Sequence, residues 1–261
     1  MNNTVDIVKK YLNFRRDVNG ILLLNKPKGI SSNGFLQKLK IIFCAKKAGY
    51  IGTLDPLATG MLPICFGKAN KFVSYLTNAD KRYRVKAFLG QSTNTFDAEG
   101  KITSIKPVIF NKNNLEDVLN LFRGEMDQIP PMFSALKYKG IPLYKYANKG
   151  INIYRQPRKI SIYSLKLINW SANKLELEIH CSKGTYIRVI INDIGEKLGC
   201  GAYVQSLHRL SVAHFSEESM IQFDEIKRIV SENISLLESK TIFYKIDQLL
   251  LPYEQLRRNI L

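Results

Sequence analysis

Cysteine and histidine are scarce in this sequence. Among 261 residues there are four cysteines, which occur singly at wide spacings, and only three histidines. Structural zinc sites and disulfide frameworks need such residues at short, recurring spacings. We therefore expect neither a metal site nor disulfides. The cysteines are Cys44, Cys65, Cys181 and Cys200, and the histidines are His180, His208 and His214.

Long apolar stretches are also absent. No run approaches the roughly 20 apolar residues of a membrane-spanning helix. The first residues, MNNTVDIVKKYLNFRRD, carry too many charges for a secretory signal. Neither a dinucleotide fingerprint nor a phosphate-binding P-loop occurs. These absences predict a cytoplasmic protein that has no membrane partner and needs no cofactor.

Acidic residues are few relative to basic ones. Asp and Glu total 22 against 39 Lys and Arg, which gives a net charge of +17 and a pI near 9.7. This excess favours a polyanionic partner, either nucleic acid or an acidic membrane surface, and we favour nucleic acid. Because the sequence has no internal repeat, long linker or low-complexity segment, one domain is the simplest expectation.

Strands and helices are intermixed along the chain, which predicts a mixed α/β (α+β) fold. Strands are predicted at residues 20–25, 82–90, 159–170 and 174–182. Alternation in the last of these places Cys181 on the apolar face and His180 on the polar face. Helices are predicted from Ser31 or Ser32 to Phe43, from an Asn113 or Asn114 cap to Phe122, and after the TYIR segment up to Gly199.

The most informative segment is residues 49–60, GYIGTLDPLATG, which displays one carboxylate in a turn. Pro56 disfavours the helical conformation for Asp55, while Gly49, Gly52 and Gly60 permit backbone angles or close approaches that a side chain would block. An Asp-Pro pair alone is an ordinary turn. In this setting the displayed carboxylate is a candidate nucleophile or acid.

This run, which continues as MLPICFGKANKF, resembles the catalytic motif of the TruB family of tRNA pseudouridine synthases. The resemblance extends over residues 17–252 and implies the pseudouridine synthase fold, a central mixed, largely antiparallel sheet flanked by helices and loops. It also implies an isomerase that converts the T-loop uridine of tRNA to pseudouridine, with Asp55 as nucleophile. The implied partner is the tRNA T-arm, and we expect a monomer with no obligatory protein partner.

Two further motifs resemble the family. In DKRYRVKAFLG, basic residues alternate with Tyr83, which the resemblance makes a stacking and proton-transfer residue; a half-buried strand tyrosine is the alternative. In SKGTYIRVIIN, Arg188 matches the arginine that pairs with the catalytic aspartate, and Tyr186 would share its face if the strand persisted. Tyr186 and Leu207 match positions that line the base pocket, although the pattern alone places Leu207 in the core.

Two weaker matches complete the resemblance. Lys26 and Pro27 resemble a motif that supports the catalytic loop, and a plain strand-to-helix turn explains them equally well. The middle segment, about 131–159, mixes lysines with tyrosines and resembles a mobile thumb that clamps RNA. We expect an N-terminal extension at 1–16, a catalytic domain at 17–252 and a short tail at 253–261, without the C-terminal RNA-binding barrel of many relatives.

One departure keeps an alternative open. Tyr50 stands where the bacterial family commonly has a histidine that supports the extruded nucleotide; a phenol still stacks but cannot become an imidazolium cation. A non-catalytic tRNA-binding or tRNA-folding protein is therefore the second interpretation. An aspartyl-phosphate phosphotransferase is a third and weaker interpretation, because that class of enzyme needs a second carboxylate at the position that Leu57 occupies.

Overall fold

The computed structural model describes residues 3–11, 14–233, 236 and 241–254. The chain forms two compact units: the first unit is Met1–Ala79 with His208–Leu261, and the second unit is Asp80–Leu207. The expectation of one catalytic domain at 17–252 stays a prediction. The expected extension at 1–16 and tail at 253–261 fall partly outside the described residues.

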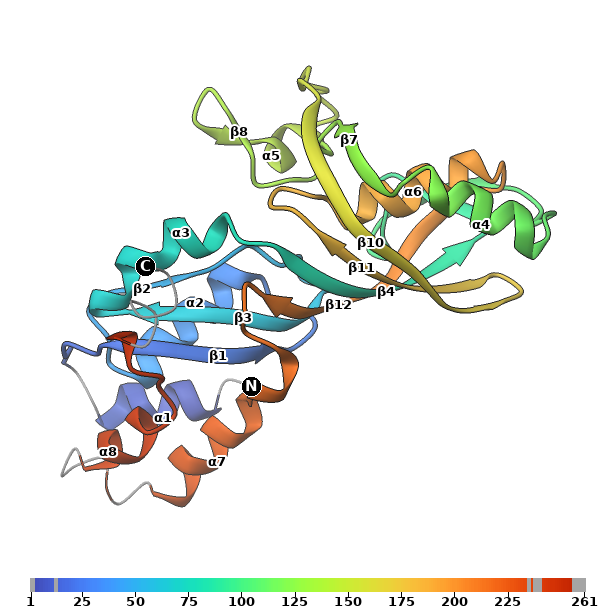
Figure 1. Cartoon of the computed structure of the whole chain (residues 1–261). Helices are drawn as coiled ribbons and strands as arrows, with labels where there is room; N and C mark the ends of the chain where they lie inside the picture. The colour runs from blue at the N-terminus through green and yellow to red at the C-terminus, as the bar shows by residue number, and fades with distance from the viewer. Residues whose placement is uncertain (1–2, 12–13, 234–235, 237–240, 255–261) are drawn as a thin grey trace. The chain divides into compact units, whose positions relative to one another are not determined.

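The first unit is built on a short mixed sheet (Figure 1). Strand β1 (Gly20–Lys26) pairs antiparallel with β3 (Thr59–Phe66) and parallel with β13 (Ile221–Gln222). Strand β2 (Ala48–Tyr50) adds antiparallel to β3, and β12 (Ala202–Val212) joins β3 in parallel at His208 and Arg209. The helices and 3-10 turns of this unit are α1 (Asn3–Tyr11), α2 (Ser32–Ile42), η1 (Gly67–Phe72), α3 (Val73–Thr77), η2 (Glu217–Ser219), α7 (Phe223–Glu232) and α8 (Ile242–Asp247).

Both faces of β1 are buried, which explains its unbroken apolar run. Ile21 and Leu23 join a core cluster with Ile51 and Met61 on one face. On the helical side, α7 contacts β1, and the ring of Phe35 from α2 meets that of Phe223 from α7 edge-on at 4.7 Å. A strand covered on both sides needs apolar residues at successive positions rather than alternation.

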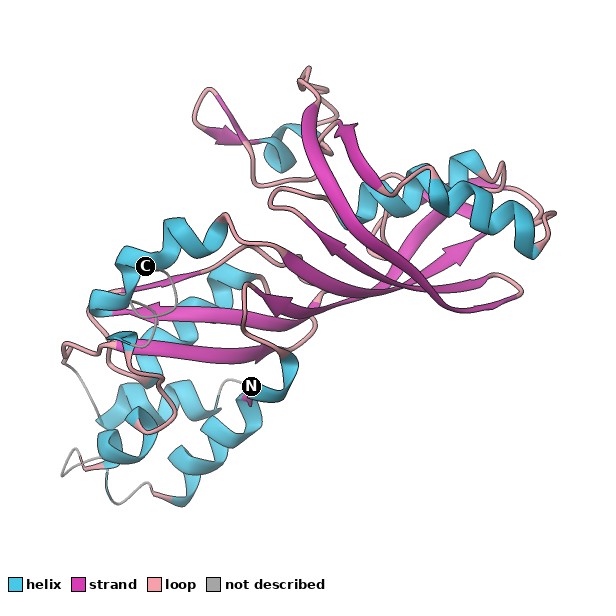
Figure 2. Cartoon of the chain, in the orientation of Figure 1, coloured by secondary structure: helices cyan, strands magenta, loops and turns pink. Residues whose placement is uncertain are grey.

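The second unit carries an antiparallel sheet with the order β4-β11-β10-β7. These strands are β4 (Lys81–Leu89), β11 (Lys174–Cys181), β10 (Arg158–Ser171) and β7 (Gly124–Gln128), and the first six residues of β12 belong to this unit. Helices α4 (Lys112–Asn120) and α6 (Ile187–Lys197) contact each other, and α6 packs on β4 (Figure 2). The smaller elements are β5 (Gln91–Thr93), β6 (Ile102–Ile105), β8 (Lys137–Tyr138), β9 (Ile141–Pro142) and α5 (Leu143–Ala147).

The predicted fold class is confirmed, and all four predicted strands are present within one or two residues as β1, β4, β10 and β11. Cys181 is fully buried on β11, whereas His180 is partly exposed on the opposite face, as alternation predicts. Within the described ranges every helix is too short or too polar to cross a bilayer.

The helix ends were predicted with mixed success. Ser31 caps α2 by accepting from the amide of Gly34, and Gly199 follows α6 with a φ of +79°, both as predicted. The cap predicted at Asn113 or Asn114 is wrong, because Asn111 caps α4. Asn114 instead bonds back to the Asn111 amide in a reciprocal capping box, which starts the helix earlier.

Candidate active site

Asp55 lies in the loop between β2 and β3, and we call residues 51–58 the Asp55 loop. Ile51, Leu54 and Leu57 of this loop are buried, while Asp55 is only partly buried. The apolar side chains therefore point into the first unit and anchor the loop. The amide of Ala58 donates to the Asp55 carbonyl at 3.1 Å, which closes a tight turn around the carboxylate.

Lys26 reaches this loop from the end of β1, and Pro27 is the next residue. The Lys26 ammonium is completely buried and donates to the carbonyls of Pro27 at 2.9 Å, Ile30 at 2.8 Å and Pro56 at 3.4 Å. The amide of Gly29 also donates to Pro56, at 2.8 Å. This segment therefore makes the turn into α2 and also holds the residue next to Asp55.

Ser32 holds the other side of Asp55. Its hydroxyl accepts from the amide of Leu54 at 2.8 Å and donates to the Leu54 carbonyl at 3.0 Å. Ser32 is buried, and its position in the sequence predicted only a helix cap. No local pattern pairs a helix-start serine with a backbone segment 22 positions away, so the contact had no sequence signal.

Tyr50 and Tyr83 stand in different settings. Tyr50 ends β2 opposite Ile64 and is partly exposed. Tyr83 is 8% exposed on the inner face of β4. The arginines on either side of Tyr83 point to the opposite face, where Arg84 lies 3.3 Å from Glu178. These arginines therefore do not line the same face as the tyrosine, as the alternating sequence requires.

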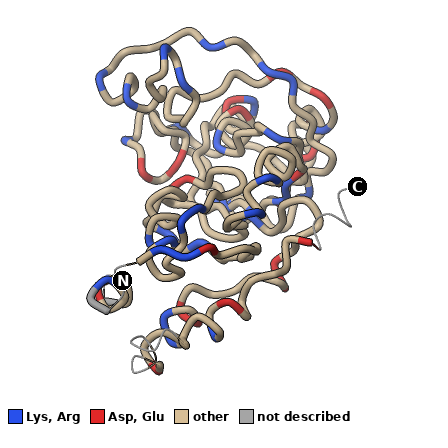
Figure 3. The backbone as a smooth tube through the Cα atoms, turned by 90° about the vertical axis from the view of Figure 1, so that its left-hand side faces the viewer, with Lys and Arg blue, Asp and Glu red and all other residues tan. Residues whose placement is uncertain are grey.

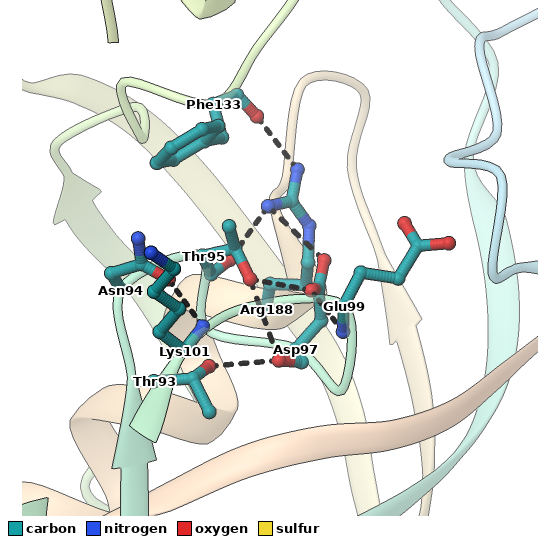
Figure 4. A network of polar contacts seen from close by, with 8 residues as sticks. All are labelled: Thr93, Asn94, Thr95, Asp97, Glu99, Lys101, Phe133 and Arg188. Atoms are coloured by element: carbon teal, nitrogen blue, oxygen red, sulfur yellow. Dashed lines mark hydrogen bonds and ion pairs between the residues drawn. The ribbon is translucent and has the colours of Figure 1, made fainter. Parts of the chain in front are cut away.

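Arg188 is buried in the first turn of α6, with 4% of its side chain exposed. Its Nη1 donates to the carbonyl of Thr95 at 2.8 Å and its Nη2 to that of Phe133 at 2.9 Å. The Oδ2 of Asp97 lies 3.5 Å from Nη1 (Figure 4). A cation in the first helical turn faces the positive end of the helix dipole, so Asp97 offsets both this repulsion and the burial of the charge.

Asp97 is itself held firmly, with 5% of its side chain exposed. Its Oδ1 accepts from the Thr95 hydroxyl at 2.6 Å and from the amide of Glu99 at 3.1 Å. Its main-chain carbonyl accepts from the hydroxyl of Thr93 at 2.8 Å. Asp97 carries no signal in the sequence, because the FDAEG segment has the pattern of an ordinary turn and its cationic partner lies far along the chain.

Tyr186 precedes α6 as its N-cap residue, so the strand does not persist through Tyr186 to Arg188, and the condition for a shared face is not met. The reason is that β11 ends at Cys181 and helical geometry begins at Ile187. Buried Gln128 fixes the Tyr186 backbone by donating to its carbonyl at 3.1 Å and accepting from its amide at 2.8 Å.

Leu207, the fourth predicted site residue of the second unit, is 6% exposed on β12. The structure thus gathers Lys26, Pro27, Tyr50 and Asp55 around one loop of the first unit, whereas Tyr83, Tyr186, Arg188 and Leu207 belong to the second. The pairing of Asp55 with Arg188 accordingly remains a proposal.

The predicted thumb at 131–159 carries exposed basic and aromatic groups. Tyr138 and Tyr144 are both 41% exposed, and the lysines between and beside them face solvent. The segment is anchored by buried Leu143, whose amide donates to the Leu136 carbonyl at 2.7 Å. Figure 3 shows Lys and Arg spread along the backbone of both units rather than confined to one element. The exposed lysines and tyrosines of residues 131–159 suit phosphate contacts and base stacking.

Family models and curated relatives both match this chain over most of its length. Residues 40–187 match the N-terminal domain model of the TruB family of pseudouridylate synthases, and residues 188–257 match the tRNA pseudouridylate synthase B C-terminal domain. A tRNA pseudouridine synthase B of Blochmanniella floridana is 55% identical over 95% of this chain and 98% of that protein. One of Hamiltonella defensa is 53% identical over 92% of this chain and 74% of that protein.

Solved structures show the same fold. In a Cbf5-Nop10-Gar1 complex, one chain matches with a TM-score of 0.68 and 26% identity over 95% of this chain. In an archaeal box H/ACA Nop10-Cbf5 complex, the TM-score is 0.65 at 22% identity over 91% of this chain. This protein spans 62% and 61% of the length of those two chains. From the family models and the close relatives together, the chain belongs to the TruB family of pseudouridylate synthases.

Proposed function

We propose that this chain is a tRNA pseudouridine synthase, an isomerase that acts on the T-loop uridine at tRNA position 55. Its close relatives carry the name tRNA pseudouridine synthase B. The observation that carries the proposal is the Asp55 loop, where buried leucines and the contacts of Lys26 and Ser32 hold the segment that displays one carboxylate.

The reaction needs a nucleophile and proton transfers but no oxidant and no phosphate energy. The N-glycosidic bond of uridine breaks, the base turns, and a carbon–carbon bond joins it to the ribose. The ring carbon loses its proton and the freed ring nitrogen gains one, so the product is an isomer of the substrate. Asp55 attacks either the sugar or the uracil ring and leaves again once the new bond has formed.

Arg188 and Tyr83 complete the proposed machinery. A guanidinium is charged at every working pH, so Arg188 beside Asp55 would keep that carboxylate ionised and oriented. Asp97 and the carbonyls of Thr95 and Phe133 hold the guanidinium in one rotamer (Figure 4). Tyr83 would stack on the target base and take part in moving its proton.

The substrate uridine is stacked inside the folded T-arm, so the enzyme has to extrude it. Extrusion costs a few kcal/mol, which stacking on Tyr50 and Tyr83 offsets in part. Tyr186 and Leu207 would line the base pocket. The exposed tyrosines and lysines of residues 131–159 would grip the RNA stem, since RNA loops are recognised by shape and stacking. We propose that the protein works as a monomer in the cytoplasm, without metal, cofactor or protein partner.

Incubating purified protein with a T-arm RNA labelled at uridine, without added cofactor, tests the proposal. We expect pseudouridine with the wild type and none with Asp55→Asn, because the amide keeps the shape but is not nucleophilic. RNA affinity should stay within about tenfold, or roughly 1.4 kcal/mol. The control is Asp17→Asn, which removes a carboxylate that is 75% exposed and paired with Lys46.

The same experiment tests the alternative function. If the chain is a non-catalytic tRNA-binding protein, the wild type and Asp55→Asn both bind the RNA with equal affinity, and neither forms pseudouridine. Wild-type turnover by Asp55→Asn would instead remove Asp55 from the mechanism while leaving the activity in place.

A further inference from the structure

Arg209 is among the largest fully buried side chains of the described residues, with 1% of its surface exposed. It lies on β12 and donates to three main-chain carbonyls of the first unit. Its Nε bonds to Met61 at 2.7 Å, and its Nη2 bonds to Gly52 at 3.0 Å and Ile51 at 3.2 Å. A charged group removed from water needs several such acceptors to remain in the interior.

The three acceptors lie on the two ends of the Asp55 loop. Ile51 and Gly52 enter the loop, and Met61 follows it in β3. The backbone also approaches closely here, because a Cβ on Gly60 would overlap the carbonyl of Arg209. One planar guanidinium therefore bridges the entry and the exit of the loop that carries Asp55.

We infer that Arg209 is a positioning residue for the isomerisation: by joining both ends of the Asp55 loop it sets where the Asp55 carboxylate stands. This inference rests on the proposed function, because it presumes that Asp55 reacts with the substrate. Lys26 and Ser32 hold the middle of the loop at Pro56 and Leu54, so Arg209 supplies the contacts at the base that those residues do not make.

Arginine suits this place better than lysine. Its donors are held in a rigid plane, so bonds to Met61 and to Gly52 fix the separation of the two carbonyls. A lysine ammonium retains the charge but presents its protons from one atom on a flexible stem. Arg209→Lys should therefore keep the buried cation and loosen the geometry of the loop.

Arg16 offers a matched control in the same unit. Its Nε donates to the Phe43 carbonyl at 2.9 Å, and its two Nη atoms bond to the Asp247 carboxylate at 2.5 Å. Arg16→Lys thus weakens the contacts of a partly buried arginine that also binds a backbone carbonyl but does not hold the Asp55 loop. A purely structural role for Arg209 predicts that both variants lose activity only in proportion to unfolding.

The experiment measures the single-turnover rate with saturating full-length enzyme, RNA affinity and amide hydrogen exchange in the same preparations. For Arg209→Lys we expect a rate loss of roughly 10- to 100-fold, since misplacement by about 1 Å can cost 10²-fold. Affinity should stay within about threefold. Peptides covering 51–61 should exchange faster, and those covering 32–42 should not. Arg16→Lys should keep the wild-type rate.

A wild-type rate in Arg209→Lys, or unchanged exchange in residues 51–61, overturns the inference. Arg209→Met, which keeps the apolar stem and loses every donor, should be slower still; a rate above that of the lysine variant also contradicts it. If Asp55→Asn is fully active, the proposed function of Asp55 fails. If Asp55→Asn is inactive while Arg209→Lys is normal, only the positioning role fails.

Discussion

Replacing Asp97 by asparagine removes one buried charge and leaves the shape of the side chain nearly unchanged. The amide oxygen can still accept from Thr95 and Glu99, but an NH2 group replaces the Oδ2 that lies 3.5 Å from Arg188. At this distance and an effective dielectric constant of about 20, the gross attraction lost is about 5 kcal/mol. Since Arg188 keeps two carbonyl partners, we expect a net loss of about 3 kcal/mol in the free energy of unfolding.

Thermal unfolding and single-turnover kinetics check this prediction. A loss of about 3 kcal/mol corresponds to a fall in Tm of about 6 to 12 °C for a chain of this size. At temperatures below the unfolding transition, the single-turnover rate should fall about 100-fold, because the Arg188 guanidinium is no longer held in one orientation.

The matched control is Glu178→Gln, which breaks a pair of similar length in the same unit. Glu178 lies 3.3 Å from Arg84, and these side chains are 20% and 45% exposed. That variant should cost less than about 1 kcal/mol. Equal stability losses in the two variants would refute the argument from burial, and a normal rate in a destabilised Asp97→Asn protein would refute the positioning of Arg188 by Asp97.

Three further outcomes are expected. Ser32→Ala leaves the buried amide and carbonyl of Leu54 unpaired, so it should cost about 1–3 kcal/mol in a denaturant titration and slow turnover; an unaltered midpoint would contradict this. Burial raises the pKa of Cys65 and Cys181 to about 12, so a thiol reagent at pH 8 should label neither in the native protein and both in denaturant. The charge of +17 predicts that RNA affinity falls with salt, with a log-log slope of roughly −0.7 to −0.9 per phosphate neutralised, and a flat salt series would exclude phosphate contacts as its source.

Local patterns in the sequence were sufficient to predict much of the fold. The alternation in β4 and β11, the serine before α2 and the glycine after α6 act over a few residues, so they can be read directly. Strand β3 was not predicted, because Pro63 interrupts it and proline is disfavoured inside sheets. Pro63 is tolerated because β3 pairs with β12 only at Thr59 and Gly60. The Pro63 carbonyl still accepts a hydrogen bond from the Ile51 amide.

The supports of the candidate site could not be predicted in this way. Asp55 and Arg188 were singled out by a motif, but Asp97, Gln128 and Arg209 carry no periodicity that marks them. Their partners lie 58 positions away for Gln128 and up to 158 for Arg209, so only the tertiary structure pairs them. A buried polar residue in a sequence shows that a partner must exist without indicating which one.

The bonds of Arg209 also have a consequence during synthesis on the ribosome. The guanidinium and the carbonyls it joins are separated by 148 to 158 positions, with the whole second unit between them. At roughly 5–20 residues per second, the Asp55 loop emerges about 7 to 30 s before the residue that ties its ends. The nascent chain can complete residues 80–207 in that interval, whereas the contacts that join the two ends of the Asp55 loop form only after β12 has been added. The Asp55 loop is therefore completed only late in translation.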